Sequence, residues 1–109
     1  ERPKVPSEYH TRINELCDLS AECAENMAKA SRAFFRDLSS VRDYSQKVYF
    51  IEHESDAASR KLSEAIFDSD LPLANKLQLG GFVNDIGDIA DTAEDFIDSL
   101  LIFTIKRDV

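Results

Sequence analysis

The sequence predicts an all-α fold, with three long helices in an up-down-up antiparallel bundle. Residues that break helices are scarce: the 109 residues include three glycines and three prolines, and two of the prolines lie in the first six residues. This scarcity favours long helices over a sheet with many turns. In addition, apolar residues recur at alternating steps of three and four through three segments, which is the spacing of helices packed in a bundle. The length allows one domain, residues 1–109, with one modest core.

The first two helices are expected over residues 7–37 and 40–67. Ser7 follows Pro6 and is a good N-cap, so residues 1–6 are expected to be extended. The core positions of the first helix are Ile13, Leu16, Ser20, Cys23, Met27, Ala30 and Phe34. Those of the second helix are Val41, Tyr44, Val48, Ile51, Ser55, Ala58, Leu62 and Ala65. Asp and Ser residues before Pro72 favour a turn after residue 67.

The third helix is expected over residues 72–106, and its apolar pattern is the most regular. Its core positions are Leu79, Phe82, Ile86, Ile89, Ala93, Phe96, Leu100 and Phe103. Three glycines within it each cost about 1 kcal/mol relative to alanine, which suggests close helix approach. A second apolar strip lies beside the first, at Val83, Ala90, Ile97 and Leu101. This strip either widens the core or docks another bundle, and the second interpretation predicts a homo-oligomer, most simply a homodimer.

The charge and the cysteines restrict the class of protein. The net charge is −8, with 13 basic against 21 acidic residues, which disfavours nucleic acid as a partner. Cys17 and Cys23 lie about 9 Å apart along one helix, too far for a disulfide, and the low cysteine count suggests a cytoplasmic protein. The longest apolar run, residues 100–105, is too short to span a bilayer, so membrane contact is expected only through a partner.

The polar side of the third helix is entirely acidic. Between residues 77 and 105 there is no Lys or Arg, whereas six acids occur there: Asp85, Asp88, Asp91, Glu94, Asp95 and Asp98. Like charges one turn apart destabilise a helix by a few tenths of a kcal/mol per pair. The sequence therefore tolerates a penalty that a bound cation or a basic partner would offset.

A cation site is predicted where the second and third helices meet. Glu52 and Asp56 lie one turn apart, and in an antiparallel pair they could face Asn84 and Asp88. Carboxylate oxygens are the ligands that hard cations prefer, and Asp85 and Asp91 are further candidate ligands. The alternative is a solvated acidic face on which Asp56 pairs with Arg60.

Catalytic chemistry has little support in the sequence. His10 and His53 are the only histidines, and neither a Glu-x-x-His pair nor a Cys-x-x-Cys motif occurs. Gly80-Gly81 is an isolated pair and does not form a phosphate-binding loop. No nucleophile lies near a base and an orienting group, so we expect no enzymatic activity.

Two stretches of the sequence resemble the PhoU-like family. They are Ile51-Glu-His-Glu-Ser-Asp56 followed by Arg60, and Asp85-Ile-Gly-Asp-Ile-Ala-Asp91 followed by Thr-Ala-Glu-Asp95. They are most similar to the branch of phosphate-transport regulators that accompany Pit-type phosphate permeases. That family is built from three-helix repeats, usually two per chain, and this chain resembles one repeat, more closely the C-terminal one.

The resemblance implies a regulatory or accessory role in inorganic phosphate uptake, through contact with a phosphate permease or a signalling protein. Family members can hold surface metal clusters on paired acidic motifs, which implies Fe, Zn, Ni, Mn or Mg as the cation here. The first motif is intact as Glu52 and Asp56, whereas Asn84 replaces an acid in the second, a departure that weakens the expectation of a full cluster. The alternative function is a structural oligomerisation domain with a solvated acidic face and no metal.

Overall fold

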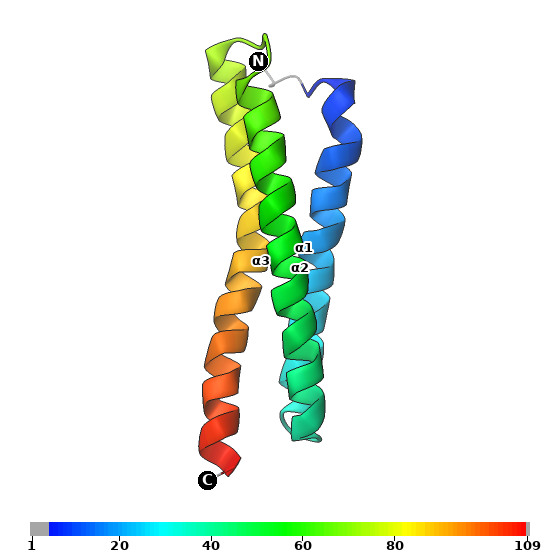
Figure 1. Ribbon diagram of the computed structural model, residues 1–109, viewed down its shortest axis with the longest axis vertical. Helices are drawn as coiled ribbons and strands as arrows, with labels where there is room; N and C mark the ends of the chain where they lie inside the picture. The colour runs from blue at the N-terminus through cyan, green and yellow to red at the C-terminus, as the bar shows by residue number, and fades with distance from the viewer. Residues whose placement is uncertain (1–4, 109) are drawn as a thin grey trace.

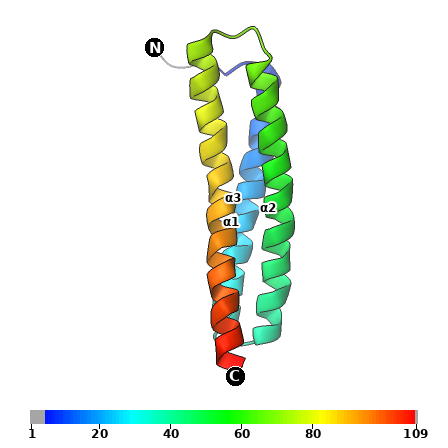
Figure 2. The ribbon, with the colours of Figure 1, turned by 60° about the vertical axis from the view of Figure 1, so that its left-hand side comes forward.

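The protein is a bundle of three helices that run along one long axis. The computed structural model describes residues 5–108, with side chains as far as Lys106. A 3-10 turn, η1 (Ser7–Tyr9), leads into α1 (His10–Ala33), α2 (Leu38–Phe67) and α3 (Leu73–Asp108). The rod measures 56 × 23 × 20 Å, and α2 runs antiparallel to α1 and α3 (Figure 1). Each helix packs against the other two (Figure 2). The prediction of an all-α three-helix bundle is confirmed.

The end of α2 at Phe67 is as predicted, and the other helix ends differ from the predicted ones by one to four residues. Ser7 opens η1 and its carbonyl accepts a hydrogen bond from the His10 N–H, whereas Tyr9 is the N-cap of α1, which begins at His10. Residues 1–4 of the predicted extended segment lie outside the described residues. At the start of α2, Asp37 is the N-cap: its carboxylate accepts hydrogen bonds from the Ser39 N–H at 3.0 Å and from the Ser39 and Ser40 hydroxyls. These bonds, that from Ser39 first, hold the pKa of Asp37 below its ordinary value.

The core consists of two apolar clusters with buried serines between them. One cluster lies near the start of α1 and includes Leu16, Leu62 and Val83, all at most 1% exposed. The other extends toward the α1–α2 turn and is built from smaller residues, among them Cys23 and Ala30. Between them, the hydroxyl of buried Ser20 donates a hydrogen bond of 2.8 Å to the Ile86 carbonyl, which ties α1 to α3.

The core side of α3 is not the one predicted. Val83, Ala90 and Ile97 are at most 1% exposed and Leu101 is half-buried, so the second strip lines the core, as the first of its two interpretations predicted, and is not exposed for docking another bundle. Phe82, Ile89, Phe96 and Phe103, predicted as core, are instead 41–62% exposed. The other four predicted core residues, Leu79, Ile86, Ala93 and Leu100, are all buried. Smaller residues were selected because α1 approaches α3 closely here, as the bond from Ser20 shows.

Two of the three glycines of α3 lie against α2. A Cβ at Gly87 would be 3.4 Å from the Ser59 hydroxyl oxygen, and one at Gly80 would be 3.8 Å from the ring of Phe67. A Cβ at Gly81 would have no other atom within 4 Å. A Cβ at Gly80 would be in ordinary van der Waals contact, so Gly87 is the glycine at which close approach of α2 leaves least room for one.

We predict that Gly81→Ala raises the free energy of unfolding by about 0.5–1 kcal/mol, because alanine has the higher helix propensity and open space receives its methyl group. Gly87→Ala should gain less, since Ser59 must accommodate the added methyl. Urea unfolding monitored by circular dichroism measures both changes. A loss of stability in Gly81→Ala would contradict the packing described here.

Both cysteines are free; Cys17 is exposed and Cys23 is buried. Burial, followed by the charge of Glu52, raises the pKa of Cys23 to about 11. No helix in the described part of the chain is both long and apolar enough to cross a membrane.

Candidate functional site

The most unusual ionisable group of the protein is Glu52, on the flank of α2 that faces α3. Its side chain is only 11% exposed. On α3 its neighbours are Glu94 and Asp91, and on α2 the Nδ1 atom of His53 lies 3.7 Å from its carboxylate. Burial, followed by hydrogen bonding and charge repulsion from Glu94 and then from Asp91, raises the pKa of Glu52 to about 7. This carboxyl group is therefore partly protonated at neutral pH.

Tyr49 lies one turn before Glu52 on the same flank of α2. Its hydroxyl donates a hydrogen bond to the carboxylate of Asp98. Burial, followed by this bond to Asp98, raises the pKa of Tyr49 to about 12. The contacts of Tyr49 with Asp98, of Glu52 with Glu94 and of Ser59 with Gly87 together define the antiparallel register of α2 and α3.

This register separates the residues predicted to hold a cation. Glu52 faces Asp91 and Glu94, whereas Asp88 lies near the level of Ser59, about two helical turns away. Asp56 pairs with Arg60, with 2.6 Å between the guanidinium nitrogen and the carboxylate oxygen. Asn84 and Asp85 are exposed, and Asp85 and Asp88 line a groove on the α1 side of α3.

In this register Glu52 meets Asp91, one of the further candidate ligands, but it does not meet Asp88. Among the described side chains, residues 5–106, no group of three or more from His, Cys, Asp and Glu is arranged to hold a metal ion. The alignment of α2 and α3 assumed from the sequence differs from the observed one by about two turns. Metal binding itself stays a prediction, which elemental analysis of the purified protein measures directly.

The acids of α3 form an exposed surface, which we call the outer acidic face. It consists of Asp85, Asp88, Asp91, Asp95 and Asp98, all exposed. The ion pairs among the described residues are Glu25–Lys29, Glu52–His53 and Asp56–Arg60, so none of these five acids has a cationic partner there. A surface of this kind attracts cationic groups.

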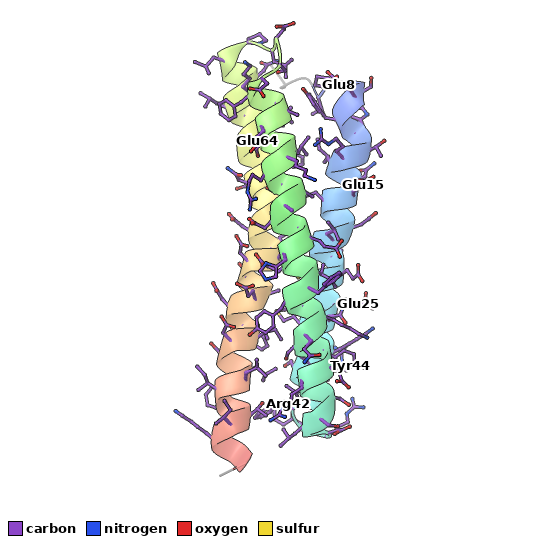
Figure 3. The ribbon with its side chains drawn as sticks, in the orientation of Figure 1. Glu8, Glu15, Glu25, Arg42, Tyr44 and Glu64 are labelled. Carbon is purple, nitrogen blue, oxygen red and sulfur yellow. The ribbon has the colours of Figure 1, made fainter. Side chains whose placement is uncertain are left out.

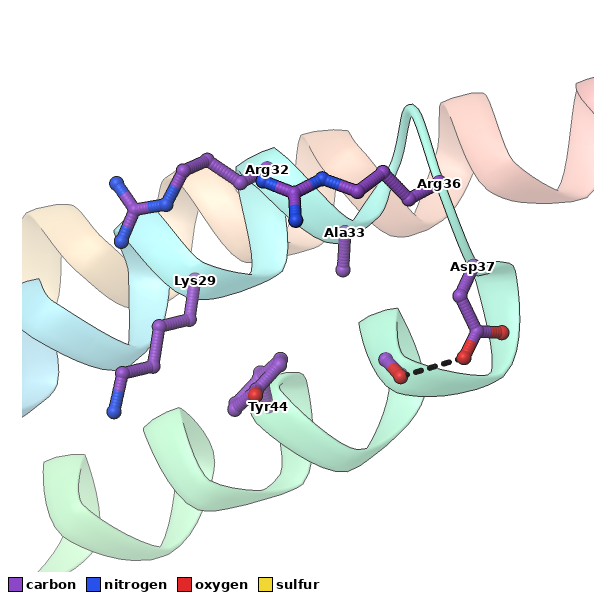
Figure 4. A pocket seen from close by; sticks show the side chains of 7 residues that line it. Lys29, Arg32, Ala33, Arg36, Asp37 and Tyr44 are labelled. Carbon is purple, nitrogen blue, oxygen red and sulfur yellow. Dashed lines mark hydrogen bonds between the residues drawn. The ribbon is translucent and has the colours of Figure 1, made fainter.

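Basic residues collect near the α1–α2 turn, a feature that the sequence analysis did not identify. Lys29, Arg32 and Arg36 line a shallow pocket of about 260 Å³ together with Tyr44 (Figure 4). Lys29 also pairs with Glu25 at 3.4 Å and lies 6.0 Å from the ring centre of Tyr44. Arg32 and Arg36 form no ion pair with any described acid. Figure 3 places Arg42 and Tyr44 at this end of the rod and Glu8 and Glu64 at the other.

Comparison with known proteins finds two similar proteins, both named UPF0111. The chain is 32% identical to a UPF0111 protein of Thermotoga maritima over 107 residues, which are 98% of this chain and 50% of that protein. It is 29% identical over 107 residues to the UPF0111 protein PH1389 of Pyrococcus horikoshii, covering 97% of this chain and 50% of that protein. No family model matches the chain, and no solved structure matches it. The chain is thus similar to UPF0111 proteins and spans about half the length of these curated relatives.

Proposed function

We propose that this chain is a regulatory module of inorganic phosphate transport that acts by binding a phosphate permease or a signalling protein associated with it. The observation that carries the proposal is the outer acidic face of α3, whose five acids are exposed and have no cationic partner among the described residues. The resemblance of the stretches at residues 51–60 and 85–95 to phosphate-transport regulators supplies the pathway. In this proposal the chain is cytoplasmic and reaches the membrane only through its partner.

Charge complementarity supports a transporter as the partner. Cytoplasmic loops of membrane proteins carry an excess of Lys and Arg. An acidic helix face that meets such loops gains attraction over long range and speeds association. Binding would also relieve the repulsion between acids one turn apart on α3.

The proposal includes no catalytic step. Glu52 has a pKa of about 7, a value typical of general acids and bases, yet it lines neither the groove between α1 and α2 nor the groove between α1 and α3. A substrate would need access to its carboxylate, and the side chain is only 11% exposed.

The test is a binding measurement with the phosphate permease of the source organism, reconstituted in nanodiscs. Neutralising Asp91→Asn with Asp95→Asn is expected to weaken binding about tenfold and to reduce its dependence on salt, because two attractive charges are lost. Both residues are exposed, so the fold should be retained.

The matched control is Glu15→Gln with Asp18→Asn, which removes the same charge from the exposed side of α1. This control should bind as the wild type does. If both double variants weaken binding equally, net charge and not the outer acidic face determines affinity. If the wild-type chain does not bind the permease at low salt, the permease is not its partner.

A second candidate function, a structural oligomerisation domain, is favoured by a different observation. Phe82, Ile89, Phe96 and Phe103 leave an apolar strip of α3 exposed. This function needs neither the acids nor a permease, so Asp91→Asn with Asp95→Asn would leave it unchanged.

A further inference from the structure

The end of the rod at the α1–α2 turn is rich in positive charge, although the chain as a whole is acidic. Five of the 13 basic residues but only two of the 21 acidic residues lie between residues 26 and 47. The basic residues of this segment are Lys29, Arg32, Arg36, Arg42 and Lys47. The outer acidic face belongs to α3, so this concentration of positive charge is a separate feature of the surface.

The chain keeps a helical course through the turn, which aligns three of these basic side chains. Lys29 and Arg32 are three residues apart on α1, and Arg36 follows four residues later. The Arg36 N–H donates a hydrogen bond of 2.9 Å to the Ala33 carbonyl, so Arg36 lies about one turn beyond Arg32. Side chains spaced by three and four residues are neighbours on one side of a helix, where like charges repel.

These side chains border the shallow pocket of about 260 Å³ between the end of α1 and the first two turns of α2 (Figure 4). Ser40 and Tyr44, one turn apart on α2, line the other side of this pocket. The hydroxyl of Ser40 donates a hydrogen bond to Asp37, whereas that of Tyr44 has no hydrogen-bond partner among the described residues. The pocket therefore combines three cations with a phenol that is available as a donor.

The two arginines of the pocket are available to bind an anion. Neither Arg32 nor Arg36 forms an ion pair with a described acid, and both are exposed. Lys29 pairs with Glu25 at 3.4 Å, but the two side chains are 42% and 64% exposed. A pair this exposed contributes little to stability, so the ammonium can be shared with a ligand.

Asp37 is the acid that lines this pocket, and its carboxylate is engaged at the start of α2. It accepts hydrogen bonds from the Ser39 N–H and from the hydroxyls of Ser39 and Ser40. In Figure 4 the side chain of Arg36 extends toward Arg32 and away from Asp37. The residues that line the pocket thus carry three positive charges against one negative charge.

We propose that this pocket binds a phosphate group. A guanidinium presents its N–H donors in a planar fork that matches the oxygens of phosphate, and the bonds it forms are charge-assisted. Two guanidinium groups one turn apart, with an ammonium beside them, suit a group that carries close to two negative charges better than a carboxylate, which carries one. Such a ligand would also relieve the repulsion among the three cations. The pocket is separate from the outer acidic face, so this inference goes beyond the proposed function and does not depend on it.

An NMR titration of the isotope-labelled chain tests the site, with sodium phosphate and glycerol phosphate as the two probes. Either probe should shift the backbone N–H signals of residues 29–44 with a dissociation constant on the order of 1 mM or lower. Sodium acetate at the same ionic strength should need at least about a tenfold higher concentration, because its carboxylate carries less charge. Binding of sodium phosphate would show that the free ion is sufficient, and binding of glycerol phosphate alone would identify the ligand as a phosphate ester.

Arg32→Gln with Arg36→Gln should weaken phosphate binding at least about tenfold, because two charge-assisted donors are lost. Arg42→Gln with Lys61→Gln is the matched control, since both residues are exposed, neither lines the pocket and the same charge is removed. This control should bind phosphate nearly as the wild type does. Circular dichroism verifies that each variant is folded.

Two results would overturn the proposal. The first is the absence of a saturable shift with both phosphate probes. The second is equal weakening in the two double variants, or an equal response to acetate, because the pocket would then respond only to net charge. The titration uses no permease, so its outcome is separate from that of the test of the proposed function.

Discussion

Replacing Ile97 by alanine is expected to lower the free energy of unfolding by about 2–5 kcal/mol, because the change leaves a cavity in a closely packed core. The side chain of Ile97 is fully buried and belongs to the cluster formed with Val48 and Ile51. A loss of this size is a large fraction of the total stability of a small domain, which is about 5–15 kcal/mol. Ile97→Ala is therefore expected to be partly unfolded at physiological temperature.

The adjacent residue provides the control for this prediction. Phe96 is larger than Ile97 but 41% exposed, so Phe96→Ala should cost roughly 1 kcal/mol or less in the monomer. Urea unfolding at concentrations that keep the chain monomeric compares the two variants. A larger loss in Phe96→Ala than in Ile97→Ala would mean that α3 is rotated relative to the arrangement described here.

Raising the pH from about 5 to about 8 is expected to destabilise the fold by about 1–3 kcal/mol through Glu52 alone. Its pKa is about 7 in the folded protein and 4.5 as the ordinary value, so the folded state binds more protons than the unfolded state between these values. The stability contributed by the protonated form is therefore fully present below about pH 4.5 and is lost as the pH rises through about 7. The groups that face Glu52 are Glu94 and Asp91 on α3, His53 on α2 and the thiol of Cys23 on α1.

Glu52→Gln should remove this dependence, because an amide stays neutral at every pH. The free energy of unfolding of the variant should match that of the wild type near pH 5. Near pH 8 it should be higher by about 1–3 kcal/mol. Glu54→Gln, two positions along the same helix at an exposed site, is the matched control and should retain the wild-type dependence. Urea unfolding curves at the two pH values measure this change in the free energy of unfolding. An equal change in Glu52→Gln and in the wild type would show that Glu52 is not the group that titrates.

The sequence was sufficient for the architecture and for most of the packing of α1 and α2. Alternating steps of three and four identify buried Leu16, Cys23, Val48 and Leu62 correctly, because each of these helices has one apolar line. In α3 two apolar lines lie beside each other. Regular spacing favoured the line with three phenylalanines, whereas Val83, Ala90 and Ile97 of the other line are the residues buried in the core.

The register of α2 against α3 could not be read from the charge pattern. The acids suggested an alignment in which Glu52 meets Asp88, but the Tyr49–Asp98 hydrogen bond and the contact between Gly87 and Ser59 belong to a different one. The spacing of apolar residues predicts which side of a helix is buried. It does not predict how far the helix is shifted along its partner. The burial of Glu52 beside Glu94 and Asp91 follows from that translation, so its raised pKa could not be predicted either.

Phosphate uptake by proteoliposomes that contain the purified permease tests the proposed regulatory role most directly. Addition of the wild-type chain on the cytoplasmic side should change the uptake rate, and the Glu15→Gln, Asp18→Asn control should have the same effect. The Asp91→Asn, Asp95→Asn variant should need about a tenfold higher concentration for that effect, because its affinity is weaker. An uptake rate that stays constant at saturating concentrations of the wild-type chain would contradict a regulatory role in phosphate transport.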